Sequence, residues 1–263
     1  MYISYSSLSD WSKCPFYFKL KYIDKIPHDK GSIHTAFGNA VHATNQSILV
    51  DNISDIENVF KTNFKRSLKE LSGNIKQNIF SDKSLKKLAK EMMEVGPSLC
   101  KKSIEELHKQ FPGFVIISTE SKIIEPIISY MKKNFEFKGI LDVVIHTPSD
   151  DTIHILDWKT TSWGWDAKKR NDKMTTYQLT YYKHFLSQQE DIELNKIKTH
   201  FGLIKRTAKK DNIEIFETKI GKKKIDNALK LLNTMVYNVD NEKFPKNRLS
   251  CKYCPFLKTE FCP

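Results

Sequence analysis

Two apolar, β-branched segments separated by a polar turn most constrain what this chain can form. Segments 136–146 and 152–159 read EFKGILDVVIH and TIHILDWK, which is typical of two strands of a β-hairpin with a longer loop. Because side chains two apart in a strand share a face, Asp157 and Lys159 point the same way. With Asp142, fifteen residues before Asp157, the hairpin gathers two carboxylates and a lysine. A solvated strand end is the alternative interpretation.

Short motifs flank this hairpin in a fixed order. From residue 42 to residue 182 they are GNAVHATNQ with His42, Gly139-Ile140-Leu141-Asp142, Asp157-Trp158-Lys159, and Gln178-Leu179-Thr180-Tyr181-Tyr182. In this set the chain resembles the PD-(D/E)XK nuclease superfamily, specifically its RecB-like exonuclease branch. The resemblance implies an α/β, restriction-endonuclease-like fold, in which a mixed central sheet is flanked by helices within a single domain spanning 1–263.

The same resemblance implies a divalent-metal site. His42, Asp142, Asp157 and the backbone carbonyl of Trp158 would hold Mg²⁺ or Mn²⁺, which prefer hard oxygen ligands, and Mn²⁺ also tolerates imidazole. A bound cation would polarise the phosphoryl oxygen and generate hydroxide from water. Lys159 would stabilise the developing negative charge. The alternatives are a core or capping histidine at position 42 and a surface lysine at position 159.

Further residues are candidates for substrate or metal contact. Apolar periodicity over 171–187 predicts a helix with Gln178 and Tyr182 on its inward face. The resemblance implies that both position substrate phosphate or the catalytic water, and a core hydrogen bond is the alternative for Gln178. Arg170 is a candidate DNA contact, or else a solvated arginine. Glu120 matches a glutamate common in RecB-like sequences, where it would support the metal shell through water; an ordinary edge-strand glutamate is the alternative.

Cysteine spacing gives a second pattern. One cysteine lies early and three form C-x₂-C-x₇-C near the end, namely Cys14, Cys251, Cys254 and Cys262. C-x₂-C lets two thiolates reach one metal from a tight turn. The layout resembles the iron–sulfur staple of RecB-like helicase-nucleases and CRISPR-associated exonucleases, which implies a 4Fe–4S cluster joining 1–22 to 245–263. A structural Zn²⁺ with four cysteine ligands is the alternative. Cys100, outside the pattern, is interpreted as a small buried hydrophobe.

The remaining segments predict the order of elements. Residues 53–110 are charged and helical, and we expect a helical insertion or cap over the cleft that is broken at Gly96-Pro97. The expected strands are 114–128, 136–146, 152–160, 198–206 and 212–219, and a final helix is expected at 222–239.

Charge and hydropathy bound the function. The formal net charge of +12 suits a DNA partner, although a lysine-rich composition from an AT-rich genome would produce it too. No apolar run approaches the roughly 20 residues of a membrane span. The N-terminal sequence lacks the pattern of a secretory signal, so we expect a cytoplasmic protein without membrane contact.

These observations together predict a Mg²⁺- or Mn²⁺-dependent deoxyribonuclease, most simply an exonuclease. It would hydrolyse phosphodiester bonds of single- or double-stranded DNA in recombination, repair, or phage or CRISPR DNA processing. A helicase or CRISPR adaptation proteins would be its partners. The alternative is a DNA-binding or helicase-associated subunit with little nuclease activity of its own.

Overall fold

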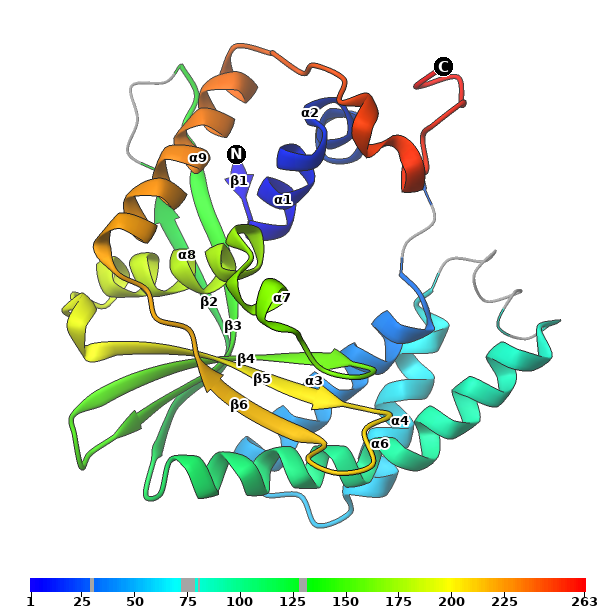
Figure 1. Cartoon of the computed structure of the whole chain (residues 1–263), viewed down its shortest axis with the longest axis vertical. Helices are drawn as coiled ribbons and strands as arrows, with labels where there is room; N and C mark the ends of the chain where they lie inside the picture. The colour runs from blue at the N-terminus through cyan, green and yellow to red at the C-terminus, as the bar shows by residue number, and fades with distance from the viewer. Residues whose placement is uncertain (29–30, 72–78, 80, 128–131) are drawn as a thin grey trace.

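A mixed six-stranded sheet forms the centre of the molecule (Figure 1). The computed structural model describes residues 1–28, 31–71, 79, 81–127 and 132–263. In that part of the chain the strands are β1 (Tyr2–Ile3), β2 (Val115–Pro126), β3 (Glu136–Thr147), β4 (Thr152–Thr161), β5 (Ile197–Lys205) and β6 (Ile213–Glu217). β3 pairs antiparallel with β2 and β4 and parallel with β1, β4 pairs parallel with β5, and β6 pairs antiparallel with β5.

Helices cover both faces of this sheet. One layer contains α1 (Tyr5–Lys13), α8 (Lys173–Gln189) and α9 (Lys222–Asp240), and the other contains α3 (Ile33–Asp51), α4 (Ile56–Lys69) and α6 (Lys83–Gln110). Short helices are α2 (Pro15–Phe18), a π-helix (Lys19–Ile23), α7 (Ala167–Asn171), and 3₁₀ segments Leu194–Lys196 and Arg248–Tyr253. Among the described helices none is long and apolar enough to cross a bilayer.

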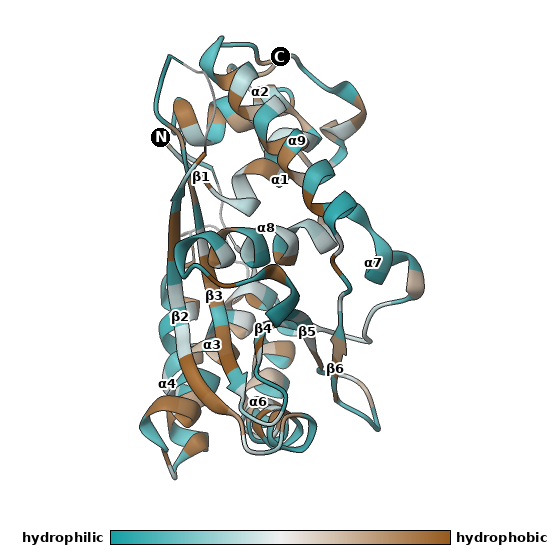
Figure 2. Ribbon diagram, turned by 90° about the vertical axis from the view of Figure 1, so that its left-hand side faces the viewer, coloured by the Kyte–Doolittle hydropathy of each residue, from teal (hydrophilic) through white to brown (hydrophobic). Residues whose placement is uncertain are grey.

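Two hydrophobic cores fix the sheet between these layers. Phe137, Leu141 and Phe201 pack with α1, α8 and α9 in the first core. Val143 and Trp158 pack with α3, α4 and α6 in the second. Figure 2 shows the corresponding brown, apolar segments along β2 and β3. The expected mixed sheet flanked by helices is confirmed, and β2 to β6 fall on the predicted strands.

The helical segment 53–110 differs from expectation in two ways. Its described helices pack against α3, and α6 also packs on β5 and β6, so the segment forms part of a layer on the sheet. α6 runs through Gly96 and Pro97 without a break. At Gly96 an added Cβ would lie 2.0 Å from Cζ of Phe60, so the glycine lets α6 pack directly on the α4 ring. This packing holds the helix together across the proline.

Candidate active site

Two carboxylates face each other across β2 and β3. The register pairs Thr119 with Val143 and Ser121 with Leu141, which places Glu120 opposite Asp142. Glu120 has φ of +48°, a left-handed conformation that is unusual for this residue type and concentrates at functional sites. Like charges at directly opposed positions repel. A cation between them would remove that repulsion.

His42 approaches the same point from α3. Its Nδ1 lies 3.3 Å from Asp142 Oδ2 and 3.9 Å from Glu120 Oε1. One turn earlier in the helix, a Cβ on Gly38 would lie 3.2 Å from Oγ1 of Thr160, so the glycine permits close approach of α3 to β4. Ligand atoms of His42, Glu120 and Asp142 all lie within 4.8 Å of one another. We call these three residues the carboxylate–histidine cluster.

Asp142 also joins β3 to β4 where their ladder has ended. The last register pair of the two strands is Val143 with Leu156. Beyond it, the backbone N–H of Trp158 donates to Asp142 Oδ2 at 2.7 Å. The carboxylate therefore takes the place of a ladder partner. A side chain that is fixed in this way keeps its second oxygen available in a defined direction.

Asp157, Lys159, Gln178 and Tyr182 form a connected group beside this cluster. Asp157 Oδ1 accepts from Gln178 Nε2 at 2.7 Å, and its Oδ2 lies 2.5 Å from Lys159 Nζ. Gln178 Nε2 also lies 3.1 Å from the Tyr182 hydroxyl. The Tyr182 ring lies against Gly139, where a Cβ would come within 2.8 Å of the ring. α8 thus holds Asp157 from the opposite layer to the one that supplies His42.

Burial and mutual charge shape the ionisation of the site. Burial raises the pKa of Asp157 above its usual value, although the Lys159 ammonium opposes this effect. Burial would lower the pKa of His42, but the adjacent Asp142 carboxylate reverses this and raises it well above 6.5. The pKa of Asp142 is correspondingly lowered because the His42 charge outweighs its burial. Opposite charges are therefore already paired before any ligand binds.

The donor set fits a hard divalent cation. Two carboxylates and one imidazole converge, which is a donor chemistry that Mn²⁺ and Mg²⁺ accept. Asp157 Oδ2 is buried and accepts no hydrogen bond of ordinary geometry from the described residues, despite its contact with Lys159. The sequence interpretation placed Asp157 among the ligands and Glu120 behind them. In the structure Glu120 is the third member of the compact cluster, and the register opposite Asp142 was the signal that could have found it.

Arg170 is engaged within the protein. Its Nη2 donates to Glu214 Oε1 at 2.7 Å and its Nε donates to the Trp165 carbonyl at 3.0 Å. The guanidinium also lies 4.5 Å from the ring centroid of Phe216. These contacts use two of the five N–H donors of the guanidinium, and a role of Arg170 in DNA contact stays a prediction.

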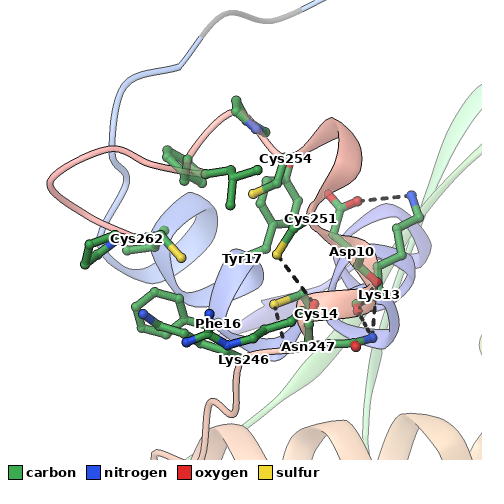
Figure 3. A pocket seen from close by; sticks show the side chains of 17 residues that line it. Asp10, Lys13, Cys14, Phe16, Tyr17, Lys246, Asn247, Cys251, Cys254 and Cys262 are labelled. Atoms are coloured by element: carbon green, nitrogen blue, oxygen red, sulfur yellow. Dashed lines mark hydrogen bonds and ion pairs between the residues drawn. The ribbon is translucent and has the colours of Figure 1, made fainter.

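The four patterned cysteines line one cavity between the two ends of the chain (Figure 3). This cysteine cavity, defined by Cys14, Cys251, Cys254 and Cys262, has a volume of about 390 Å³. Burial raises the pKa of the Cys254 thiol, and the neighbouring thiols of the other three add to this effect. All five cysteines are free thiols, and Cys100 is buried in the second core as expected.

Backbone contacts tie the two chain ends together around this cavity. The Asn247 N–H donates to Cys14 Sγ at 3.4 Å, and Asn247 Nδ2 and Ser250 Oγ both donate to the Lys13 carbonyl at 2.8 Å. The buried Phe256 ring packs against Tyr17 at a centroid distance of 5.7 Å. The cavity is therefore held by a small number of loop contacts.

Comparison with known proteins agrees with this architecture. The family model of the PD-(D/E)XK nuclease superfamily matches residues 2–263, so the chain belongs to that superfamily. A crystal structure from Eubacterium rectale, described as a "putative exonuclease", shares the fold with a TM-score of 0.58 and 14% identity. The alignment covers 98% of this chain and 88% of the other. A search of curated proteins found no match.

Proposed function

We propose that this protein is a Mg²⁺- or Mn²⁺-dependent deoxyribonuclease that acts as an exonuclease. The carboxylate–histidine cluster beside the Asp157–Lys159 pair carries the proposal. Membership of a nuclease superfamily and the fold shared with the Eubacterium rectale protein support it. The net charge of +12 favours a polyanionic substrate such as DNA.

The protein's own residues would divide the work as follows. His42, Glu120 and Asp142 would hold the cation, with Asp157 and the Trp158 carbonyl as further candidate ligands. When bound, a divalent cation polarises a phosphoryl oxygen and lowers the pKa of water. Lys159 would place its ammonium against the phosphate, where developing negative charge needs stabilisation.

The amide of Gln178 would orient this pair during substrate binding. Its hydrogen bond to Asp157 Oδ1 fixes the carboxylate, and the Tyr182 hydroxyl lies within hydrogen-bonding distance of the same amide. Because the ring of Tyr182 is packed on Gly139, the whole chain of contacts is anchored in the first core. Both side chains therefore act in the proposal as positioning residues.

A digestion time course tests the reaction. Single- and double-stranded DNA labelled at either end would be incubated with Mg²⁺, Mn²⁺ or EDTA. We expect progressive shortening from one end that requires the cation and is lost in Asp142→Asn. Wild-type protein that binds DNA but never cleaves it would favour the alternative of a DNA-binding or helicase-associated subunit.

We further propose that the cysteine cavity holds a 4Fe–4S cluster. Four thiols from the two ends of the chain line it, and a 4Fe–4S cluster takes four cysteine ligands. A tetrahedral Zn²⁺ would use the same four thiols and is the alternative. Protein purified without oxygen should contain iron and acid-labile sulfide, whereas one zinc per colourless chain would replace this assignment.

A further inference from the structure

The surface beside the carboxylate–histidine cluster is hollowed in two neighbouring parts along α3 and the end of β4. One part, of about 630 Å³, is lined by His42, Glu120, His34 and Thr160 among others. A second part, of about 230 Å³, shares His34 and Thr160 and ends at Arg206. Because two residues line both parts, the parts are neighbours, and Arg206 lies on the surface next to the hollow of the proposed reaction centre.

Arg206 lines the second part of the hollowed surface, and its guanidinium is an unpaired cation among the described residues. Its guanidinium makes no hydrogen bond or ion pair with the part of the chain that the structure describes, in contrast to Arg170 and its partner Glu214. Burial and the nearby Arg206 charge lower the pKa of His34, which agrees with a position close to it. A half-buried arginine without an internal acceptor is suited to a phosphate.

The turn that follows β4 carries an exposed indole, and the backbone of this turn pairs with the backbone of Arg206 and Thr207. The side chain of Trp163 is 78% exposed and makes no ring contact or hydrogen bond with the described residues. Its neighbour Trp165, by contrast, packs on Phe201 with a centroid distance of 4.9 Å. An indole without internal contacts leaves both faces of its ring available for stacking.

Backbone contacts hold the turn against the end of β5. The Arg206 N–H donates to the Thr161 carbonyl at 2.8 Å, and the Thr207 N–H donates to the Ser162 carbonyl at 3.1 Å. Gly164 has φ of +107°, and a Cβ there would lie 2.9 Å from Cδ of Lys205. These contacts fix the backbone of the turn that carries Trp163, so the ordering of this backbone does not have to accompany binding.

We propose that Trp163 and Arg206 form a binding subsite for single-stranded DNA, in which an unpaired base stacks on the indole and a phosphate binds the guanidinium. The subsite rests on the proposed nuclease function. Trp163 is the fourth residue after Lys159, a reach of at most about 14 Å, so the subsite lies within a few nucleotides of the reaction centre. Stacking on an aromatic side chain needs a base that is free of its partner strand. The subsite therefore selects single strands over duplexes.

Binding measured in EDTA tests the subsite without cleavage. Trp163→Ala should lower the affinity for a fluorescent single strand about tenfold or more, within the range for one base–aromatic stack. Trp163→Phe should retain most of the affinity for the single strand. The affinity of Trp163→Ala for a blunt duplex of the same sequence should differ less than twofold from that of wild type. Arg206→Ala should weaken the binding of single strands, and Arg206→Lys should partly restore this binding. Tyr237→Ala and Lys230→Ala, on the exposed face of α9, are the matched controls and should bind as wild type.

Single abasic sites moved stepwise along the oligonucleotide sharpen the test. Wild-type affinity should fall at one position near an end, and Trp163→Ala should be insensitive to that same site. Equal single-strand binding by Trp163→Ala and wild type, or equal losses on duplex and single strand, would overturn the subsite. Failure of the nuclease proposal would appear separately, as absent cleavage by wild-type protein with Mg²⁺ or Mn²⁺.

Discussion

The carboxylate–histidine cluster and the cysteine cavity are assembled by different parts of the fold. The cluster lies on paired strands and the long helix α3, all of which are fixed by the two cores. The cysteine cavity lies between the two chain ends, where a 3₁₀ segment and loops carry three of the four thiols. One site is therefore positioned by the sheet, and the other by a few contacts between distant segments.

This difference predicts different responses to ligand loss. Because strand register holds Glu120 and Asp142 in place, removing a catalytic cation should abolish chemistry and leave the fold intact. Because 237 residues separate Cys14 from Cys251, a shared metal group would close a very long loop and contribute to folding itself. The four predictions below test this contrast.

The largest effect should follow from Asp142→Ala. The substitution removes a ligand and the acceptor for the Trp158 N–H, so the cleavage rate should fall by about 10²–10³ or more. Thermal unfolding monitored by circular dichroism should show that the variant is folded before heating, as wild type is. Cleavage at the wild-type rate by folded Asp142→Ala protein would remove the active-site assignment.

Cys14→Ser should chiefly lower stability, whereas Asp142→Ala should chiefly lower the cleavage rate. If the cavity binds a metal group, its loss should lower the free energy of unfolding by about 5 kcal/mol, the value for opening a covalent loop of about 100 residues or more. Urea titration together with iron and zinc analysis measures this change. Cys100→Ala is the matched control, because this buried thiol lies outside the cavity and its removal should leave metal content unchanged. Unchanged stability in Cys14→Ser would contradict a structural metal group.

A pair of buried histidines should make stability fall in acid. His154 Nδ1 lies 3.0 Å from His200 Nε2, and burial lowers the pKa of His154 to about 4 and that of His200 to about 3. Unfolded histidines bind protons below about pH 6.5, so the unfolded state gains protons first and stability is lost as pH falls below 6.5. The loss at pH 5 should approach about 2 kcal/mol per histidine.

Urea titrations at pH 7 and pH 5 measure this acid sensitivity. His108→Asn, at an exposed position of α6, is the control and should keep the wild-type pH dependence. His200→Asn should reduce the difference between the two pH values. Equal sensitivity in His200→Asn and wild type would show that other groups carry it.

Gln178→Ala should have the smallest effect, a decrease in cleavage rate of about tenfold. The lost hydrogen bond to Asp157 corresponds to about 1.4 kcal/mol, near the lower end for bonds to charged groups. Tyr182→Phe keeps the ring on Gly139 and serves as the milder comparison. Cleavage rates and melting temperatures of both variants would be measured together, which separates an effect on catalysis from an effect on stability. A lower melting temperature with unchanged activity per folded molecule would assign Gln178 to the core instead.

Local pattern was sufficient to predict much of the fold. Apolar, β-branched runs bounded by turn residues predicted β3 and β4. The apolar stripe around Gln178 predicted α8, because burial on one helix face imposes its period on the sequence. The order of short motifs indicated the superfamily that the family model confirms. Periodicity could not place the two-residue strand β1, which exists only through pairing with the start of β3.

The tertiary structure decided which residues that are far apart in the sequence contact one another. Glu120 became a ligand candidate through its register opposite Asp142 and its left-handed backbone, neither of which a local window contains. Arg170 found an acceptor in Glu214, 44 residues away, which no local pattern indicates. α6 continued through Pro97 because Gly96 packs on the Phe60 ring. Sequence alone determined which side chains occupy each strand and helix face, whereas packing between distant elements decided which of them meet.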